Sequence, residues 1–216
     1  MPPSPEPPAW APETAAVEAL RQADPVLRQL IDEVGPLDDF FAGRPRDDYA
    51  VLVRSIVGQQ LSTRSAAAIW GRLLARFGGH PPTPEQVLAD DPDELRTSVG
   101  LSHAKVKYLR SLAGHVLDGS LDLDGLADLP DEQVTAALTA VSGIGPWSAQ
   151  LFLMLHLRRP DVLVSGDLGI RRAVMIRYGL PTLPAPAEVD AIGEPWRPYR
   201  TLASMYLWRS LRTAPV

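Results

Sequence analysis

Apolar residues recur at helical spacing along almost the whole chain, and this periodicity constrains the fold more than any other feature. Leu52, Val53 and Ile56 share one helical face, for example, and the pattern resumes after the stretch GQQLS, residues 58–62. The one strand-like stretch, DVLVS at residues 161–165, is too short and solitary to build a sheet. The pattern therefore predicts an all-α fold.

The helical segments and their turns predict about ten helices in two lobes. The proline-rich start, residues 1–12, cannot form a helix and is predicted to be a flexible tail. The remainder, residues 13–216, is long enough to bury a core of its own. We expect one lobe around residues 45–145 and a second lobe formed by the N-terminal helices together with residues 146–216.

Composition excludes several classes of protein. The chain has no cysteine, which excludes disulfides, thiolate zinc sites and cysteine-ligated iron–sulfur clusters. No apolar run approaches the roughly 20 residues of a membrane span, and the first residues lack the features of a signal peptide. We expect a protein of the cytoplasm, associated with the nucleoid if the source is bacterial, and a monomer by default.

The charge is unevenly distributed along the chain. Residues 1–145 carry 12 Lys and Arg against 21 Asp and Glu, a net of −9, whereas residues 146–216 carry 9 Arg against 5 acids, a net of +4. A local basic face matters more for binding a polyanion than the overall net charge of −5. On charge alone, an ordinary solvated arginine-rich surface explains the basic third equally well.

The stretch VSGIGPW, residues 141–147, joins two predicted helices by a very short turn. Gly143 and Gly145 permit positive φ and close approach of another backbone, Ile144 can plug the gap between the helices, and Pro146 suits the first helical position. The geometry is that of a helix-hairpin-helix, whose second helix offers unpaired N–H groups to a phosphate. An ordinary helix–helix loop is the alternative.

From residue 129 to residue 172 the chain resembles the helix-hairpin-helix DNA glycosylases, in which the hairpin precedes an apolar helix, a Gly/Pro-rich loop and a catalytic aspartate. The apolar helix here is PWSAQLFLMLHL, the loop is DVLVSG, and Asp167 follows Trp147 by 20 positions. The stretches YAVLVRSIVGQQLSTRSAAAIWGRL, GLSHAKVKYLRSLA and PWRPYRTLASMYLWR match the alkylation-repair branch, the 3-methyladenine DNA glycosylase II group. The resemblance implies the short form of that group, without an N-terminal mixed α/β domain, and an active-site cleft between the lobes.

The resemblance also implies the reaction. Bifunctional members carry a lysine at position 147, whose amine attacks the sugar, whereas this chain has Trp147. We therefore expect a monofunctional hydrolase that excises alkylated bases of the 3-methyladenine and 7-methylguanine type from double-stranded DNA. Asp167 would be catalytic, stabilising positive charge on the sugar or activating water, although an aspartate at a helix start is also an ordinary N-cap.

The remaining expected roles follow from the same resemblance. The base pocket would be lined by Trp147, Leu151, Leu168, Met205 and Tyr206, and would be more aliphatic than that of the best-known bacterial enzyme. Gln59 and Gln60 would fill the gap left by the flipped base, unless they form only a solvated turn. Alternatively, Trp147 is an aromatic residue of the protein core.

Phosphate binding is expected from Gly143, Gly145, Arg171 and Arg172, the two arginines being plain solvated side chains in the alternative reading. Family members also bind a monovalent cation, Na⁺ or K⁺, through three main-chain carbonyls, which by position are those of Thr139, Val141 and Ile144. No other cofactor is expected. The competing hypothesis from another class is a helix-hairpin-helix DNA-binding protein without catalysis.

Overall fold

The computed structural model describes residues 14–37 and 47–213, with side chains up to residue 211. Within these ranges the chain forms α-helices and two short 3-10 helices and no strand, which confirms the predicted all-α class. Residues 161–165, the strand-like stretch, are irregular. The tail predicted for residues 1–12 lies outside the described residues.

Local signals in the sequence set most of the helix ends. Ser62 caps α4 (Thr63–Arg76) by accepting from the Ser65 N–H, and Ser102 caps α7 (His103–Leu117) by accepting from the Lys105 N–H. Thr83 and Gln86 form a reciprocal capping box at the start of α5 (Pro84–Ala89). The proline-rich segment after residue 180 contains a short helix, α11 (Pro186–Ile192), which the prolines hid from sequence reasoning.

The chain divides into two compact units, residues 1–43 with 158–216, and residues 44–157. The second boundary falls after residue 157, whereas we expected it after residue 145. The difference arises because α9 (Pro146–Leu155) packs against α8 (Asp131–Thr139) and α3 (Asp48–Gly58). This apolar helix therefore belongs to the same unit as the hairpin that precedes it.

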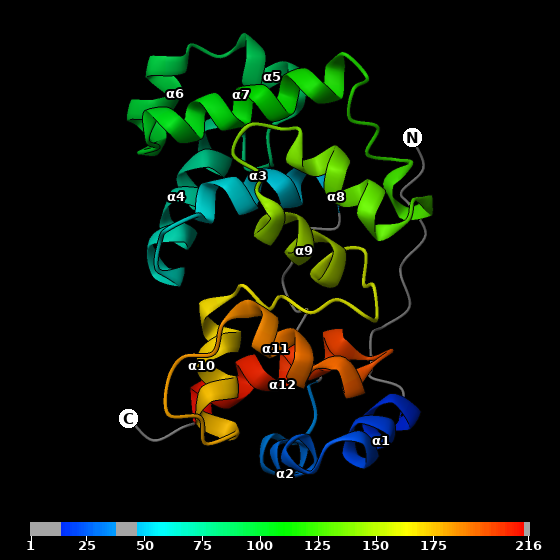
Figure 1. Ribbon diagram of the computed structural model, residues 1–216. Helices are drawn as coiled ribbons and strands as arrows, with labels where there is room; N and C mark the ends of the chain where they lie inside the picture. Colours follow the sequence, from blue (N-terminus) through cyan, green and yellow to red (C-terminus); the bar gives the residue numbers. More distant parts are fainter. Residues whose placement is uncertain (1–13, 38–46, 214–216) are drawn as a thin grey trace. The chain divides into compact units, whose positions relative to one another are not determined.

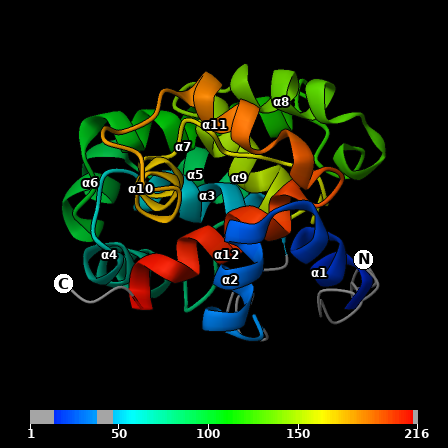
Figure 2. The ribbon, with the colours of Figure 1, turned by 60° about the horizontal axis from the view of Figure 1, so that its bottom comes forward.

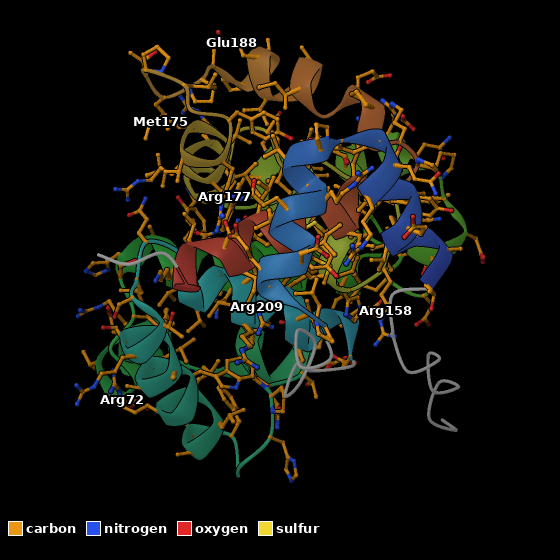
Figure 3. All side chains as sticks on the ribbon, turned by 90° about the horizontal axis from the view of Figure 1, so that it is seen from below. Arg72, Arg158, Met175, Arg177, Glu188 and Arg209 are labelled. Atoms are coloured by element: carbon orange, nitrogen blue, oxygen red, sulfur yellow. The ribbon has the colours of Figure 1, made fainter. Side chains whose placement is uncertain are left out.

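The unit built from both chain ends contains α1 (Thr14–Ala23), α2 (Pro25–Val34), α10 (Leu168–Arg177), α11, the 3-10 helix η2 (Glu194–Trp196) and α12 (Arg200–Thr213). Helix α12 packs against both α2 and α10 (Figures 1 and 2). Arg177 on α10, labelled in Figure 3, forms an ion pair with Glu33 on α2. The core is mostly aliphatic and also contains the fully buried Trp196 and the buried Tyr206.

A buried carboxylate joins the two ends of the chain in this unit. Asp24 is only 6% exposed and caps α2 by accepting from the N–H groups of Val26 and Leu27. Its Oδ2 accepts from the Tyr178 hydroxyl at 2.5 Å and from the Trp196 indole N–H at 2.9 Å. Four hydrogen bonds thus satisfy a group whose burial would otherwise be costly.

The continuous unit contains α3 to α9, including α6 (Pro92–Val99) and the 3-10 helix η1 (Leu126–Asp128). Helix α7 packs against α3, α5 and α6, and α8 packs against α9 (Figure 1). None of the helices within the described ranges of either unit combines the length and hydropathy needed to cross a bilayer.

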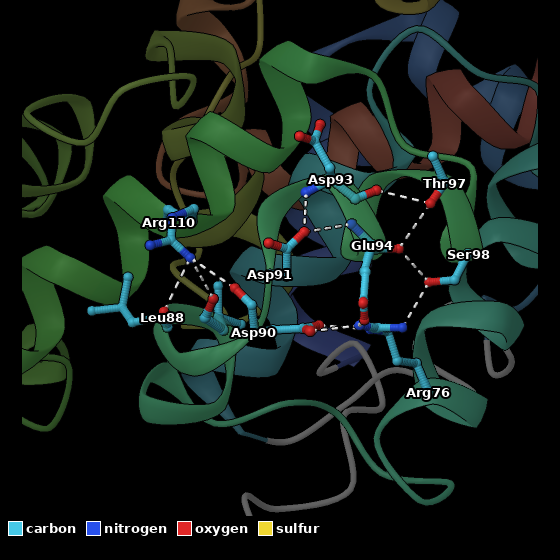
Figure 4. A network of polar contacts seen from close by, with 10 residues as sticks. Arg76, Leu88, Asp90, Asp91, Asp93, Glu94, Thr97, Ser98 and Arg110 are labelled. Atoms are coloured by element: carbon cyan, nitrogen blue, oxygen red, sulfur yellow. Dashed lines mark hydrogen bonds and ion pairs between the residues drawn. The ribbon is translucent and has the colours of Figure 1, made fainter.

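A polar network fastens α4 to the segment between α5 and α6 (Figure 4). Arg76 donates from Nε to Asp90 Oδ2 at 2.6 Å and from Nη2 to Asp90 Oδ1 at 2.5 Å, and also reaches Ser98. Arg110 on α7 donates to the carbonyls of Val87, Leu88 and Asp90. Arg110 thereby supplies donors at the C-terminal end of α5, where helical carbonyls lack partners, and Arg76 binds the carboxylate of Asp90 that follows.

The Arg76–Asp90 pair predicts a pH-dependent contribution to stability. Hydrogen bonding to Arg76 lowers the pKa of Asp90 below its ordinary value of 3.8. A lowered pKa means that the stabilisation is present above the ordinary pKa and is lost as the pH falls through the folded-state value. We expect Asp90→Asn to lower the free energy of unfolding by about 1 kcal/mol at neutral pH, and the difference from wild type to shrink below about pH 4.

Urea denaturation of both proteins across this pH range measures the difference. Asp93→Asn, at an exposed carboxylate 3.7 Å from Arg96, is the matched control. A constant difference between wild type and Asp90→Asn at all pH values would contradict the prediction.

Candidate functional site

The hairpin between α8 and α9 depends on a glycine pressed against an aromatic ring. Gly143 has φ +90, and a Cβ at this position would lie 2.2 Å from Cγ of Tyr108 on α7. Ile144 is 5% exposed and its N–H donates to the Val141 carbonyl at 3.1 Å, so it plugs the turn as predicted. Both backbone conformation and space therefore require glycine at position 143.

The other hairpin glycine differs from Gly143 in conformation. Gly145 has φ −95, which any residue can adopt, so it does not use the positive φ that glycine permits. A Cβ there would meet nothing within 4 Å. Gly145 is the N-cap of α9, no side chain caps this helix end, and Pro146 occupies the first turn. The following N–H groups are the kind that bind an anion at a helix start.

Trp147 stands in the first turn of α9 and is 43% exposed. This exposure disfavours the alternative of an ordinary core aromatic. Leu151, one turn further along the same helix, is half-buried. The residue at position 147 carries no amine, so this position offers an aromatic face and no nucleophile.

The turn between α3 and α4 assigns different tasks to its two glutamines. Gln59 donates from Nε2 to the Gly143 carbonyl at 2.8 Å, which engages its amide with the hairpin. Its expected part in filling a gap in DNA stays a prediction. Gln60 adopts φ +57, an uncommon conformation outside glycine. Leu61, which sequence reasoning missed, is 37% exposed beside it. The sequence did contain a signal for this exposure, because Leu61 is an apolar residue in a predicted turn, where it has no helical face to pack on.

Asp167 is both the N-cap of α10 and the acceptor of a tryptophan. Its Oδ1 accepts from the Ile170 N–H at 2.9 Å and from the Trp208 indole N–H at 2.9 Å. The cap and the expected catalytic role are therefore compatible, because the cap holds the carboxylate in one orientation.

Trp208 on α12 and Gly169 on α10 are site residues that sequence reasoning missed. A Cβ at position 169 would lie 2.9 Å from Asp167 Oδ1 and 3.3 Å from Trp208 Nε1, so glycine leaves room for the contact between the two side chains. No local pattern could reveal this pairing, because Trp208 follows Asp167 by 41 residues. The expected set of site residues did not include this indole.

The pocket residues expected in the unit that carries Asp167 differ in burial. Leu168, adjacent to Asp167, is 56% exposed. Met205 and Tyr206 are buried in the unit's core, at 0% and 2% exposure, and the prediction that they line a base pocket finds no support in this packing. Their helix α12 instead presents Trp208 to Asp167.

The two arginines expected to bind phosphate, Arg171 and Arg172, differ in their surroundings. Arg171 donates from Nε to the Pro184 carbonyl at 2.7 Å and thereby holds the loop that leads to α11. Arg172, which follows directly on the same helix, is exposed. Of the pair, Arg172 is the better candidate for a phosphate.

The carbonyls expected to hold a monovalent cation belong to the last turn of α8 and to the hairpin. The Val141 carbonyl accepts the Ile144 N–H and retains one lone pair, and Thr139 is the last residue of α8, where carbonyls lack helical partners. Neutral oxygen donors suit a hard cation. Within the described residues no cluster of His, Cys, Asp or Glu could hold a metal ion.

Residues 53–198 match the family model of the HhH-GPD superfamily of base excision DNA repair proteins. The chain belongs to this superfamily. DNA-3-methyladenine glycosylase 1 of Schizosaccharomyces pombe is 30% identical over 203 residues, covering 93% of this chain and 89% of that protein.

Solved structures of superfamily members place the chain in the same branch. The structure of S. pombe 3-methyladenine DNA glycosylase (Mag1) in complex with abasic DNA has a TM-score of 0.85 and 30% identity, covering 92% of this chain and 97% of that one. A DNA-3-methyladenine glycosidase from Bacillus halodurans has a TM-score of 0.80 and 34% identity, covering 93% and 91%. This HhH-GPD protein is thus a member of the DNA-3-methyladenine glycosylase branch, the alkylbase DNA glycosylases.

The Asp167–Trp208 contact yields a prediction for this HhH-GPD protein. Gly169→Ala places a methyl group against both side chains, and we expect base release from alkylated DNA to slow by about ten-fold or more, because small misplacements of reacting groups are costly. Single-turnover assays measure the rate. Alanine should not destabilise this helical position by its own propensity.

Gly166→Ala is the matched control, because a Cβ at position 166 meets nothing within 4 Å. Equal rates for wild type and Gly169→Ala would show that the contact between Asp167 and Trp208 is unimportant for the reaction.

Proposed function

We propose that this protein is a monofunctional DNA glycosylase that flips alkylated bases, of the 3-methyladenine and 7-methylguanine type, out of double-stranded DNA and hydrolyses their N-glycosidic bond. The product is an abasic site, the substrate of later steps in base excision repair. The observation that carries the proposal is Asp167, whose carboxylate is held at the start of α10 by the Ile170 N–H and the Trp208 indole.

The chemistry requires one well-placed carboxylate. Cleavage of the N-glycosidic bond develops positive charge on the sugar, and an ionised Asp167 would stabilise that charge and orient the attacking water. An alkylated purine is already cationic, so it leaves without a protein acid to protonate it. Trp147, which is 43% exposed, is the candidate to stack on such a base.

DNA would be held mainly by backbone groups of the hairpin. The N–H groups at the start of α9 would bind a phosphate, and the carbonyls of Thr139, Val141 and Ile144 would hold a monovalent cation that adds positive charge there. Such binding depends little on net charge, which reconciles the overall −5 with a polyanionic partner. The abasic DNA in the S. pombe complex supports DNA as the partner.

The α3–α4 turn would fill the gap left by the flipped nucleotide. Gln60 and the exposed Leu61 are the side chains available for this task, since the Gln59 amide is bonded to the hairpin. An apolar side chain beside a polar one can cover the exposed base faces and also reach a hydrogen-bonding group.

Asp167→Asn tests the proposed reaction. Asparagine remains a good N-cap, so the fold should persist while the negative charge is lost. We expect release of 3-methyladenine and 7-methylguanine from methylated DNA to fall by about 100-fold or more. Circular dichroism and thermal melting verify the fold.

The matched control is Asp190→Asn, at an exposed aspartate on α11. Release by Asp167→Asn at the wild-type rate would refute the proposed role of Asp167. Absence of release by the wild type on a panel of alkylated and deaminated bases would favour a non-catalytic DNA-binding protein.

Borohydride trapping tests whether the enzyme is monofunctional. Because position 147 carries tryptophan in place of an amine, we expect no covalent protein–DNA complex after reduction on alkylated or abasic DNA, and no strand cleavage at the site. A lysine-containing bifunctional glycosylase is the positive control. A trapped complex that contains the wild-type chain would show lyase chemistry and contradict the assignment.

A further inference from the structure

Three elements of the continuous unit are joined to one another by side chains. Lys105 on α7 donates from Nζ to the Val57 carbonyl at the end of α3, at 2.7 Å. Ser111 on α7 accepts the Ser142 N–H of the hairpin with its Oγ, at 3.2 Å. Gln59, directly after α3, donates to the Gly143 carbonyl. The contacts form a closed triangle between the end of α3, the hairpin and α7.

The α7 side of this triangle is one face of the helix. Lys105, Tyr108 and Ser111 follow one another at intervals of three residues, which places them on the same side. The Tyr108 ring lies against Gly143, between the two hydrogen-bonding neighbours. Partial burial lowers the pKa of Lys105, whose short contact with a carbonyl requires only an N–H donor. The face thus supports both the end of α3 and the hairpin.

The contact made by Gln59 is the one link in the triangle that does not pass through α7. Its acceptor is a main-chain carbonyl, so only the NH₂ group of the amide can make the bond, and this fixes the side-chain orientation. The two residues are 84 positions apart in the sequence, and Gln59 is partly buried. Without this bond the turn that carries Gln60 and Leu61 would be anchored only through α3 and α4.

We propose that Gln59 is a positioning residue that couples the turn entering the DNA stack to the hairpin holding the DNA backbone. This inference rests on the proposed function, in which Gln60 and Leu61 fill the gap and the hairpin binds a phosphate. Both groups act on the same stretch of DNA, so the distance between them must match the backbone geometry around a flipped nucleotide. The Gln59–Gly143 bond sets that distance before DNA arrives, which is a form of preorganisation.

A substitution that removes the donor alone tests the proposal. Gln59→Met is neutral and of similar length but has no N–H group. In the DNA-free protein we expect amide hydrogen exchange in residues 141–147 to become about five-fold faster. This is the factor by which losing one hydrogen bond of typical strength favours local opening. Gln60→Met, in the same turn, should leave exchange in this segment unchanged.

Single-turnover base release then separates positioning from plain DNA contact. We expect Gln59→Met to slow release about five-fold while its Kd for undamaged duplex stays within about two-fold of wild type. The same change is made in a background with both Gln60→Ala and Leu61→Ala. A residue that acts through these two side chains should have little further effect there, less than about two-fold.

Each alternative result has a definite meaning. Unchanged hydrogen exchange in Gln59→Met would overturn the proposal, and so would an equal five-fold loss in both backgrounds, because Gln59 would then contact DNA itself. If the wild type releases no base, the proposed function fails, and faster exchange of the hairpin would still support the coupling between the turn and the hairpin as a structural link.

Discussion

The contact between Gly143 and the Tyr108 ring is the constraint on which the continuous unit depends. A side chain at position 143 would collide with the ring, and the positive φ would be strained for any other residue. This close approach lets α8 and α9 meet through a very short turn and leaves the start of α9 uncapped by a side chain. The helix end proposed to bind a phosphate and the hairpin carbonyl that accepts from Gln59 both follow from the same compact turn.

In the other unit a single carboxylate has a structural role and a proposed chemical one. Asp167 stabilises the start of α10 as any capping aspartate does, and the same bond holds its carboxylate in one orientation. The cap and the catalytic group were alternatives in the sequence, but the capping geometry is compatible with the proposed catalytic role. Trp208 adds a second donor from α12, and Gly169 provides the space for it. The bond that caps α10 also orients the Asp167 carboxylate, so no further residue is needed for this orientation.

Most helices were predictable because their signals are local. Ser62 and Ser102 mark helix starts, and apolar spacing marks the buried faces, without reference to distant parts of the chain. The family and its aspartate were identified from motifs that keep their spacing. Sequence reasoning failed where residues far apart determine the answer. The roles of Gln59 and Trp208 depend on partners 84 and 41 positions away, and the burial of Tyr206 depends on packing of α12 that periodicity does not resolve.

The order of segments along the chain has a consequence for synthesis. The unit with the hairpin is continuous in sequence, whereas the unit with Asp167 is built from both ends of the chain. Within it, Asp24 accepts hydrogen bonds from residues that follow it by 154 and 172 positions. On the ribosome, an N-terminal part of the chain can fold before the rest has emerged. The continuous unit is therefore complete while α1 and α2 still lack α12, their apolar faces uncovered. A nascent chain at this stage contains the hairpin proposed to bind DNA, but the unit that carries Asp167, the proposed catalytic residue, is still incomplete. Synthesis from the N-terminus would therefore complete the proposed DNA-binding element before the proposed catalytic one.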